Sequence, residues 1–245
     1  MRIPVPSRRE FFVSARLKAA AATGAALLTA TALPADARAR TATEGSVTAA
    51  ELLAEVRTCA RISNGFYRTD PGAAANVPVC GTKQAVFWKA DMDIDCDGQR
   101  TTRCNRRTDP NFVSETSYQQ SDGQHLNAEE LPFVVIPGAG SLWKPGSYGI
   151  GGGSVVAVVH RDTVQYAVVG DTGPAGIIGE ASYATASALG IDPDPRTGGA
   201  QSGVTYILFR DSKASPIESH RAAVTLGDAL AREFVGRPQQ ARGGG

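Results

Sequence analysis

The 245-residue sequence is poor in charged and aromatic side chains, which make up 20% and 7% of it. The charged fraction is too low, and the apolar residues are spread too evenly, for an intrinsically disordered protein. Glycine follows no period of three and Glu/Lys heptads are missing, so collagen and coiled-coil structures are excluded. The length and the 42% apolar content suffice for one sizeable core.

Motifs of several site classes are missing as well. There is no Gly-x-Ser-x-Gly nucleophile elbow, and the glycine run at 149–153 lacks the Gly-Lys-Ser/Thr of a phosphate-binding loop. The four cysteines contain no C-x-x-C pair and the three histidines are isolated in the sequence, which argues against a zinc site. We therefore expect no cofactor and no metal.

Residues 1–39 carry the three zones of a secretory signal peptide: a basic segment, an Ala-rich apolar stretch at 19–33, and small residues before a cleavage site after Ala37 or Ala39. Arg8 and Arg9 precede two phenylalanines, similar to a twin-arginine signal, and an ordinary leader containing Arg-Arg is the alternative. No apolar stretch reaches the roughly 20 residues of a membrane helix. We expect a secreted bacterial protein that uses the twin-arginine route and has no membrane partner.

The net charge of the exported part differs from that of the whole chain. Removing residues 1–39, with six basic and two acidic side chains, changes the formal net charge from +1 to −3. A mildly acidic chain disfavours nucleic acid and anionic membranes as partners but is compatible with a cationic substrate. A single domain that acts as a monomer is the simplest interpretation.

All four cysteines lie in the exported part, where an even count predicts two disulfides. Three connectivities are possible. Because short loops cost least entropy to close, we expect the pairs Cys59–Cys80 and Cys96–Cys104.

The predicted fold class is mainly β with a few helices (α+β), in one compact β-barrel-like domain. Residues 40–48 are expected to form a loose leader, 49–236 the catalytic domain and 237–245 a disordered tail. Helical spacing predicts helices over 49–62, 181–189 and 222–234. Short apolar runs bounded by turn residues predict strands over 84–94, 132–137, 154–159, 163–170 and 204–209. The polar segment 97–130 is expected to be a long surface excursion.

Two carboxylic acids nine residues apart could face one cleft. Asp171 follows an apolar strand, and Glu180 is expected to open the next helix. Cleavage of a glycosidic bond needs such a pair, one acid to protonate the leaving oxygen and one carboxylate to activate water or attack the sugar. A purely structural interpretation is that Glu180 is an acidic residue in the first turn of a helix, where the helix dipole favours a negative charge, and that Asp171 holds a turn.

A second acidic group is the segment 91–98, DMDIDCDG. It resembles the opening of an EF-hand calcium loop, but Cys104 occupies the twelfth position, where a glutamate is needed. If the segment is extended, its four aspartates point to one side, where they repel one another unless a cation binds. A protonated amine would serve as well as a metal ion, and a solvated acidic turn is the alternative.

Four blocks, taken together and in order, resemble glycoside hydrolase family 75, the fungal and bacterial chitosanases. They are DMDIDCDG (91–98), LPFVVIP (131–137), VVGDTG…IIGEAS (168–182) and VTYILF (204–209). The resemblance implies endo-hydrolysis of β-1,4 bonds in chitosan with inversion and without a cofactor. It also places the two essential carboxylates at Asp171 and Glu180. The GDTG turn is similar to that of double-psi β-barrels, which is an analogy of fold alone.

We therefore hypothesise that Glu180 is the general acid and Asp171 the general base of an inverting chitosanase. Asp93, Asp95 and Asp97 are expected to bind the ammonium groups of the glucosamine units. Two other classes stay open at this point: a non-catalytic double-psi barrel that binds wall polysaccharide, and a dimeric aspartic protease built on the Asp171-Thr172-Gly173 triplet.

Overall fold

The computed structural model describes residues 43–237. The predicted signal peptide lies outside the described residues, as does all of the predicted tail except Arg237. In chain order the elements are α1 (Ala49–Glu55), β1 (Cys80–Gly81), β2 (Ala85–Asp95), β3 (Phe133–Pro137), the 3-10 helix η1 (Pro145–Tyr148), β4 (Val155–His160), β5 (Thr163–Gly173), β6 (Glu180–Ser182), α2 (Tyr183–Ala188), β7 (Ala200–Phe209) and α3 (His220–Phe234).

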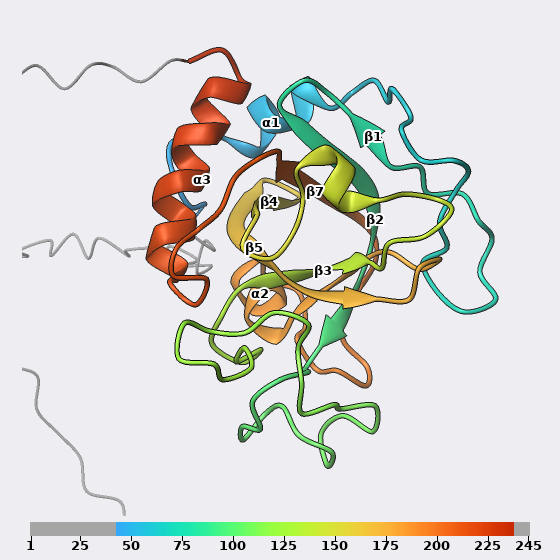
Figure 1. Ribbon diagram of the computed structural model, residues 1–245, viewed down its shortest axis with the longest axis vertical. Helices are drawn as coiled ribbons and strands as arrows, with labels where there is room; N and C mark the ends of the chain where they lie inside the picture. Colours follow the sequence, from blue (N-terminus) through green and yellow to red (C-terminus); the bar gives the residue numbers. More distant parts are fainter. Residues whose placement is uncertain (1–42, 238–245) are drawn as a thin grey trace, which may run out of the picture. The chain divides into compact units, whose positions relative to one another are not determined.

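Six of the strands close into a barrel (Figure 1). Their order is β2-β6-β3-β5-β4-β7, and β7 pairs again with β2. The β2–β6 and β3–β5 pairs are parallel and the other barrel pairs are antiparallel, while β1 is attached alongside β2. Closure leaves no unpaired sheet edge in the barrel. The predicted mainly β, barrel-like domain is thus confirmed, and the double-psi connection stays a prediction.

The strands bury both of their faces, which explains why their sequences are runs of apolar residues instead of alternating ones. Val156 and Val158 belong to the cluster inside the barrel, where the rings of Trp88 and Tyr206 stack with centroids 5.4 Å apart. The other face carries Tyr166, which packs against Gly227 of α3. Helix α3 therefore covers the outside of the barrel beside β4 and β5 (Figure 1).

The first helix is shorter than the predicted 49–62. It begins with a capping box between Thr48 and Glu51 and ends at Glu55. Beyond it the chain is held by a disulfide between Cys59 and Cys80 and by the hydrogen bond from the Gly81 N–H to the Ala60 carbonyl, 2.9 Å. These links to β1 override the helical spacing.

Both predicted disulfides are confirmed. The Cα atoms are 5.1 Å apart in Cys59–Cys80 and 4.9 Å apart in Cys96–Cys104. The second disulfide closes the start of the segment 97–130, which contains no helix or strand and forms the green loops below the barrel in Figure 1. The predicted surface excursion is therefore correct.

The described part of the leader, 43–48, is not loose. The Glu44 N–H donates to the Val164 carbonyl at 3.0 Å, and its carboxylate accepts the Tyr166 N–H at 2.9 Å. The same carboxylate contacts His220 Nε2 at 2.6 Å. These contacts to β5 and α3 fix a segment whose Thr/Ala-rich composition gave no sign of them. Within 43–237, no helix is both long enough and apolar enough to cross a membrane.

Candidate active site

Acidic side chains lie on the outer face of the barrel, in register across four neighbouring strands. Asp93 of β2 pairs with Glu180 of β6, Glu180 pairs with Val135 of β3, and Val135 pairs with Asp171 of β5. Neighbouring strands are about 4.8 Å apart, so two strand spacings separate Glu180 from Asp171 and place their Cα atoms about 10 Å apart. The register therefore brings both predicted catalytic residues to one face.

A bulge in the β3–β5 ladder brings Asp171 to this face. Val134 pairs with Val169, but the next residue, Val135, pairs with Asp171, so Gly170 is the extra residue of β5. Val169 points into the barrel core. Without the extra residue, Asp171 would follow the strand alternation and point the same way. The bulge is thus what re-aims its carboxyl group.

The Asp171 carboxylate is held in one orientation. Its side chain is 8% exposed, and its Oδ1 accepts three hydrogen bonds. The donors are the Ser117 N–H at 2.8 Å, the Ser117 hydroxyl at 2.6 Å and the Thr172 N–H at 2.6 Å. Ser117 belongs to the 97–130 excursion, which therefore reaches across the barrel surface to position a residue of β5.

Glu180 is the first residue of β6, and the prediction that it opens a helix is wrong. Helix α2 begins three residues later, and its N-cap is Ser182, whose Oγ accepts the Thr185 N–H at 3.2 Å. Gly179 precedes Glu180 with φ +115°, and a Cβ there would collide with Asp91 Oδ1. The turn before Glu180 therefore requires glycine for both its conformation and its space.

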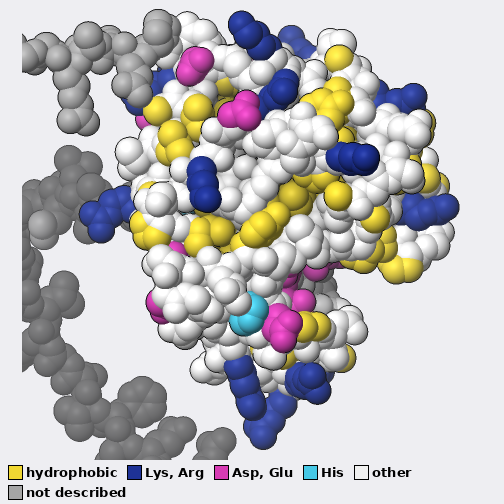
Figure 2. Space-filling view, in the orientation of Figure 1, with side chains coloured by type: hydrophobic (Ala, Val, Ile, Leu, Met, Phe, Trp, Pro, Cys, Tyr) yellow, Lys and Arg dark blue, Asp and Glu magenta, His cyan; other side chains and the backbone are white. Residues whose placement is uncertain are grey.

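A cavity of about 330 Å³ opens beside Glu180. Its lining includes the three predicted binding residues Asp93, Asp95 and Asp97, together with Asp109 and the exposed Arg196. Figure 2 shows acidic side chains in the hollow that separates the upper, larger part of the molecule from the smaller part at the bottom of the view. The described residues that line the cavity do not include Asp171, which lies on the far side of Val135 from Glu180.

Burial and mutual repulsion make these carboxyl groups hard to ionise. Burial, and next the charge of Asp93, raises the pKa of Glu180 to about 7. Burial raises the pKa of Asp97 to about 6, although the Val113 N–H donates to its carboxylate. The pKa of Asp95, which is 4% exposed, is raised well above its usual value by burial and by the charge of Glu180. The site can therefore hold protons near neutral pH and attract cations.

Three residues of this site have no signal in the sequence. Ser117 lies 54 residues before the carboxylate that it holds, and Asp109 and Arg196 belong to two loops that are distant in sequence and both line the cavity. The Asp109-Pro110 pair predicts a turn, which is what the Asp109 carboxylate supports by accepting the Asn111 N–H at 2.8 Å. Their place in the cavity follows from the loop conformations alone.

Comparison with known proteins identifies a family that matches the chain. The family described as fungal chitosanase of glycosyl hydrolase group 75 matches residues 92–234, which is more than half of the chain. An endo-chitosanase of Aspergillus fumigatus is 30% identical over 142 residues, covering 52% of this chain and 59% of the relative. Two Aspergillus oryzae relatives are an endo-chitosanase, 32% identical over 142 residues (53% and 58% covered), and endo-chitosanase B, 30% identical over 137 residues (53% and 57%). The matches thus span less than two thirds of these relatives.

Proposed function

The chain belongs to glycosyl hydrolase group 75, the fungal chitosanase family, and on that premise we propose that it hydrolyses chitosan between glucosamine units. The observation that carries this proposal is the row Asp93–Glu180–Val135–Asp171, which joins a carboxyl pair to an acidic cavity. Chitosan is a polycation when its amines are protonated, and a cavity lined by four acidic residues besides Glu180 attracts it.

Glu180 is the general acid of this mechanism. A pKa near 7 leaves its carboxyl group protonated at mildly acidic pH, where it gives the proton to the leaving glycosidic oxygen. Asp171 is the general base. Its Oδ1 is occupied by the Ser117 and Thr172 donors, so Oδ2 takes the proton of a water molecule whose oxygen attacks C1 from the opposite face. The bond from C1 to the leaving oxygen breaks as the new C1–oxygen bond forms, which releases two shorter chains.

The spacing of the two acids supports inversion. Inverting glycosidases hold their carboxyl groups roughly 6.5–9.5 Å apart so that a water fits, whereas retaining enzymes hold them roughly 5–5.5 Å apart. Two strand spacings between the Cα atoms of Asp171 and Glu180 are close to the first value and well above the second. Asp93 is only one strand spacing from Glu180, which is the retaining distance.

The remaining acids bind the chain of sugars. Asp93, Asp95 and Asp97 place their carboxyl groups along the cavity beside Glu180, where each is a partner for a glucosamine ammonium group. The Asp95 Oδ1 accepts the Asp97 N–H at 2.6 Å, so Asp95 also fixes the turn that presents Asp97. In this proposal the enzyme cleaves within the chain of sugars, and it acts as a monomer.

Export of the protein from the cell is consistent with the hydrolysis of chitosan. Two disulfides form and persist in an oxidising compartment, which the predicted twin-arginine export of residues 1–39 would provide. A polymer such as chitosan is met outside the cell.

The test is release of new reducing ends by the full chain from highly deacetylated chitosan, beside chitin and cellulose as uncharged β-1,4 polymers. We expect release from chitosan and at least a hundredfold less from the other two. Turnover of cellulose but not of chitosan would overturn the substrate assignment. Binding to chitosan without any release, by a sample with both disulfides formed, would identify a binding module instead of an enzyme.

A further inference from the structure

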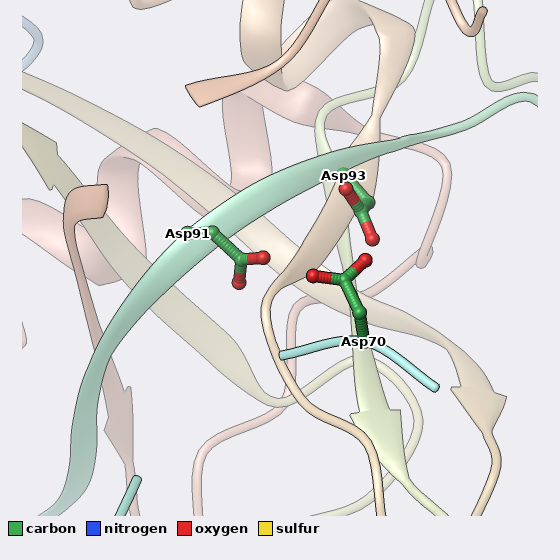
Figure 3. Close-up of side chains that lie close together, drawn as sticks. All are labelled: Asp70, Asp91 and Asp93. Atoms are coloured by element: carbon green, nitrogen blue, oxygen red, sulfur yellow. The ribbon is translucent and has the colours of Figure 1, made fainter. Parts of the chain in front are cut away.

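A second group of carboxylates shares Asp93 with the cavity of about 330 Å³. Asp70, Asp91 and Asp93 each place a carboxylate oxygen within 4.8 Å of the others. Figure 3 shows Asp91 and Asp93 extending from the same side of β2 toward Asp70, which comes from the loop between α1 and β1. The three residues are 21 and two positions apart in sequence, so the fold and not a motif assembles them.

The Asp91 side chain requires an explanation. It is 6% exposed, its carboxylate points toward Asp70, and its Oδ1 has no hydrogen-bond partner. Among the described residues, no Lys, Arg or His forms an ion pair with any of the three carboxylates, and Arg68 nearby donates instead to the Ala73 carbonyl. A buried carboxylate without a partner is costly, and buried charges in proteins are paired or bind metal ions.

The all-carboxylate donor set favours calcium over magnesium. Calcium binds six to eight oxygen ligands at about 2.3–2.6 Å in a flexible geometry, so it accepts carboxylate oxygens that lie within 4.8 Å of one another. Magnesium binds at about 2.0–2.1 Å, demands near-ideal octahedral geometry and gives up its waters reluctantly, so a site built from protein carboxylates suits it less well. A neighbouring cavity of about 10 Å³, whose lining includes Asp93 and Glu180 but neither Asp70 nor Asp91, has room for about one water molecule.

We propose that Asp70, Asp91 and Asp93 form a calcium-binding site, which takes two ligands from the acidic segment 91–98 and the third from a loop that no sequence pattern connects to it. Water molecules complete the six to eight oxygen ligands, since Asp70 and Asp93 are exposed to solvent. The site shares Asp93 with the cavity beside Glu180, so a bound calcium ion would take up one of the proposed partners of the glucosamine ammonium groups. None of the observations that support the site itself involves sugar chemistry.

Calcium at this site would link three parts of the chain. The Asp70 loop is already attached to the β5–β6 connection, since the Arg68 N–H donates to the Gly176 carbonyl at 3.1 Å and the Ile178 N–H donates to the Arg68 carbonyl at 3.0 Å. The ion adds a bond from this loop to β2. Because the folded chain binds it and the unfolded chain does not, calcium should raise the melting temperature.

The test is calorimetric titration of the EDTA-treated full chain with CaCl₂, with MgCl₂ and glucosamine hydrochloride as separate arms at equal ionic strength. We expect one calcium per chain with a Kd of about 10⁻⁴–10⁻³ M, as in extracellular modules, and at least tenfold weaker magnesium binding. The melting temperature should rise with calcium. Absence of a saturable calcium heat, or equal magnesium binding, would overturn the proposal.

Two variants locate the ion. Asp91→Asn and Asp70→Asn should each weaken calcium binding at least tenfold, whereas Glu55→Gln, which removes one exposed charge from the end of α1, should leave it unchanged. Asp70 is exposed in a loop, so its variant tests the site even if the buried Asp91→Asn fails to fold. Unchanged calcium binding in Asp70→Asn would overturn the proposal. Binding of glucosamine alone, lost in the same variant, would assign the carboxylates to an ammonium group instead.

Discussion

Asp93 of β2 and Glu180 of β6 are Cα partners in a parallel ladder, so their carboxyl groups lie side by side on the outer face of the barrel. Burial and this neighbouring charge together raise the pKa of Glu180 to about 7. The protonation state of the proposed acid is therefore set by strand register. A shift of β6 by one residue would turn Glu180 toward the barrel core.

The first prediction concerns stability against pH. Because the pKa of Glu180 is about 7 in the folded chain and 4.5 ordinarily, its ionisation opposes folding. Its contribution is most favourable below pH 4.5 and declines as the pH rises to 7. From pH 5 to pH 8, the free energy of unfolding of the wild type should therefore fall because Glu180 ionises. The Glu180→Gln variant lacks this ionisation, so its free energy of unfolding should fall by about 2–3 kcal/mol less over the same range. Urea unfolding in EDTA measures this, and parallel curves for the two proteins would contradict the assigned pKa.

The second prediction concerns Ser117 as a positioning residue. Ser117→Ala removes the hydroxyl that donates to Asp171 Oδ1 at 2.6 Å but keeps the backbone N–H. Hydrogen bonds to a charged group contribute about 1.5–3 kcal/mol, so kcat on chitosan should fall about 10- to 100-fold with little change in KM. Ser114→Ala, an exposed serine of the same segment, is the matched control. A loss that appears in KM instead of kcat would refute the positioning role.

The third prediction concerns substrate binding. Asp97→Asn keeps the size of a side chain that lines the cavity but removes its charge, so KM for chitosan should rise several-fold at low salt. The difference from the wild type should shrink as salt is added. Glu115→Gln removes an exposed charge from the same loop and should leave KM unchanged. The binding role fails if Asp97→Asn keeps the wild-type KM at low salt.

The fourth prediction ranks the disulfides. Cys59–Cys80 spans 21 residues and Cys96–Cys104 spans eight. In the chain-entropy model, their removal by paired Cys→Ser changes should cost about 3–4 and about 2–3 kcal/mol of stability, respectively. Denaturant unfolding of the two double variants measures both values. A larger cost for the shorter loop would show that it acts by holding the 97–130 segment and not by loop closure alone.

The sequence was most informative where structure is local. Apolar runs such as those of β4 and β5 are long enough to identify buried strands, and short loop closure identified both disulfide pairs correctly. The β6 strand was missed because it has three residues, and its partners Asp93 and Val135 lie 87 and 45 positions before Glu180. A helix does begin nearby, but Ser182 caps it, so the helix predicted over 181–189 starts two residues too early.

In the candidate site too, the sequence indicates the local features but not the contacts between distant segments. The strand-end position of Asp171 and the acidic pattern at 91–98 were visible in the sequence, and the resemblance paired Asp171 with Glu180. The Gly170 bulge, the Ser117 contact and the approach of Asp70 to Asp91 each join segments that are distant in sequence. No pattern of residue types specifies such contacts, because they depend on how loops fold over the barrel.

The most direct test of the catalytic pair is the anomer that forms first. Proton NMR during hydrolysis of a chitosan oligomer distinguishes the α- from the β-configured reducing end before they equilibrate. Asp171 and Glu180, two strand spacings apart, predict that the β-1,4 bond yields the α-anomer first. Initial release of the β-anomer would contradict this account and point to Asp93, one strand spacing from Glu180, as a nucleophile.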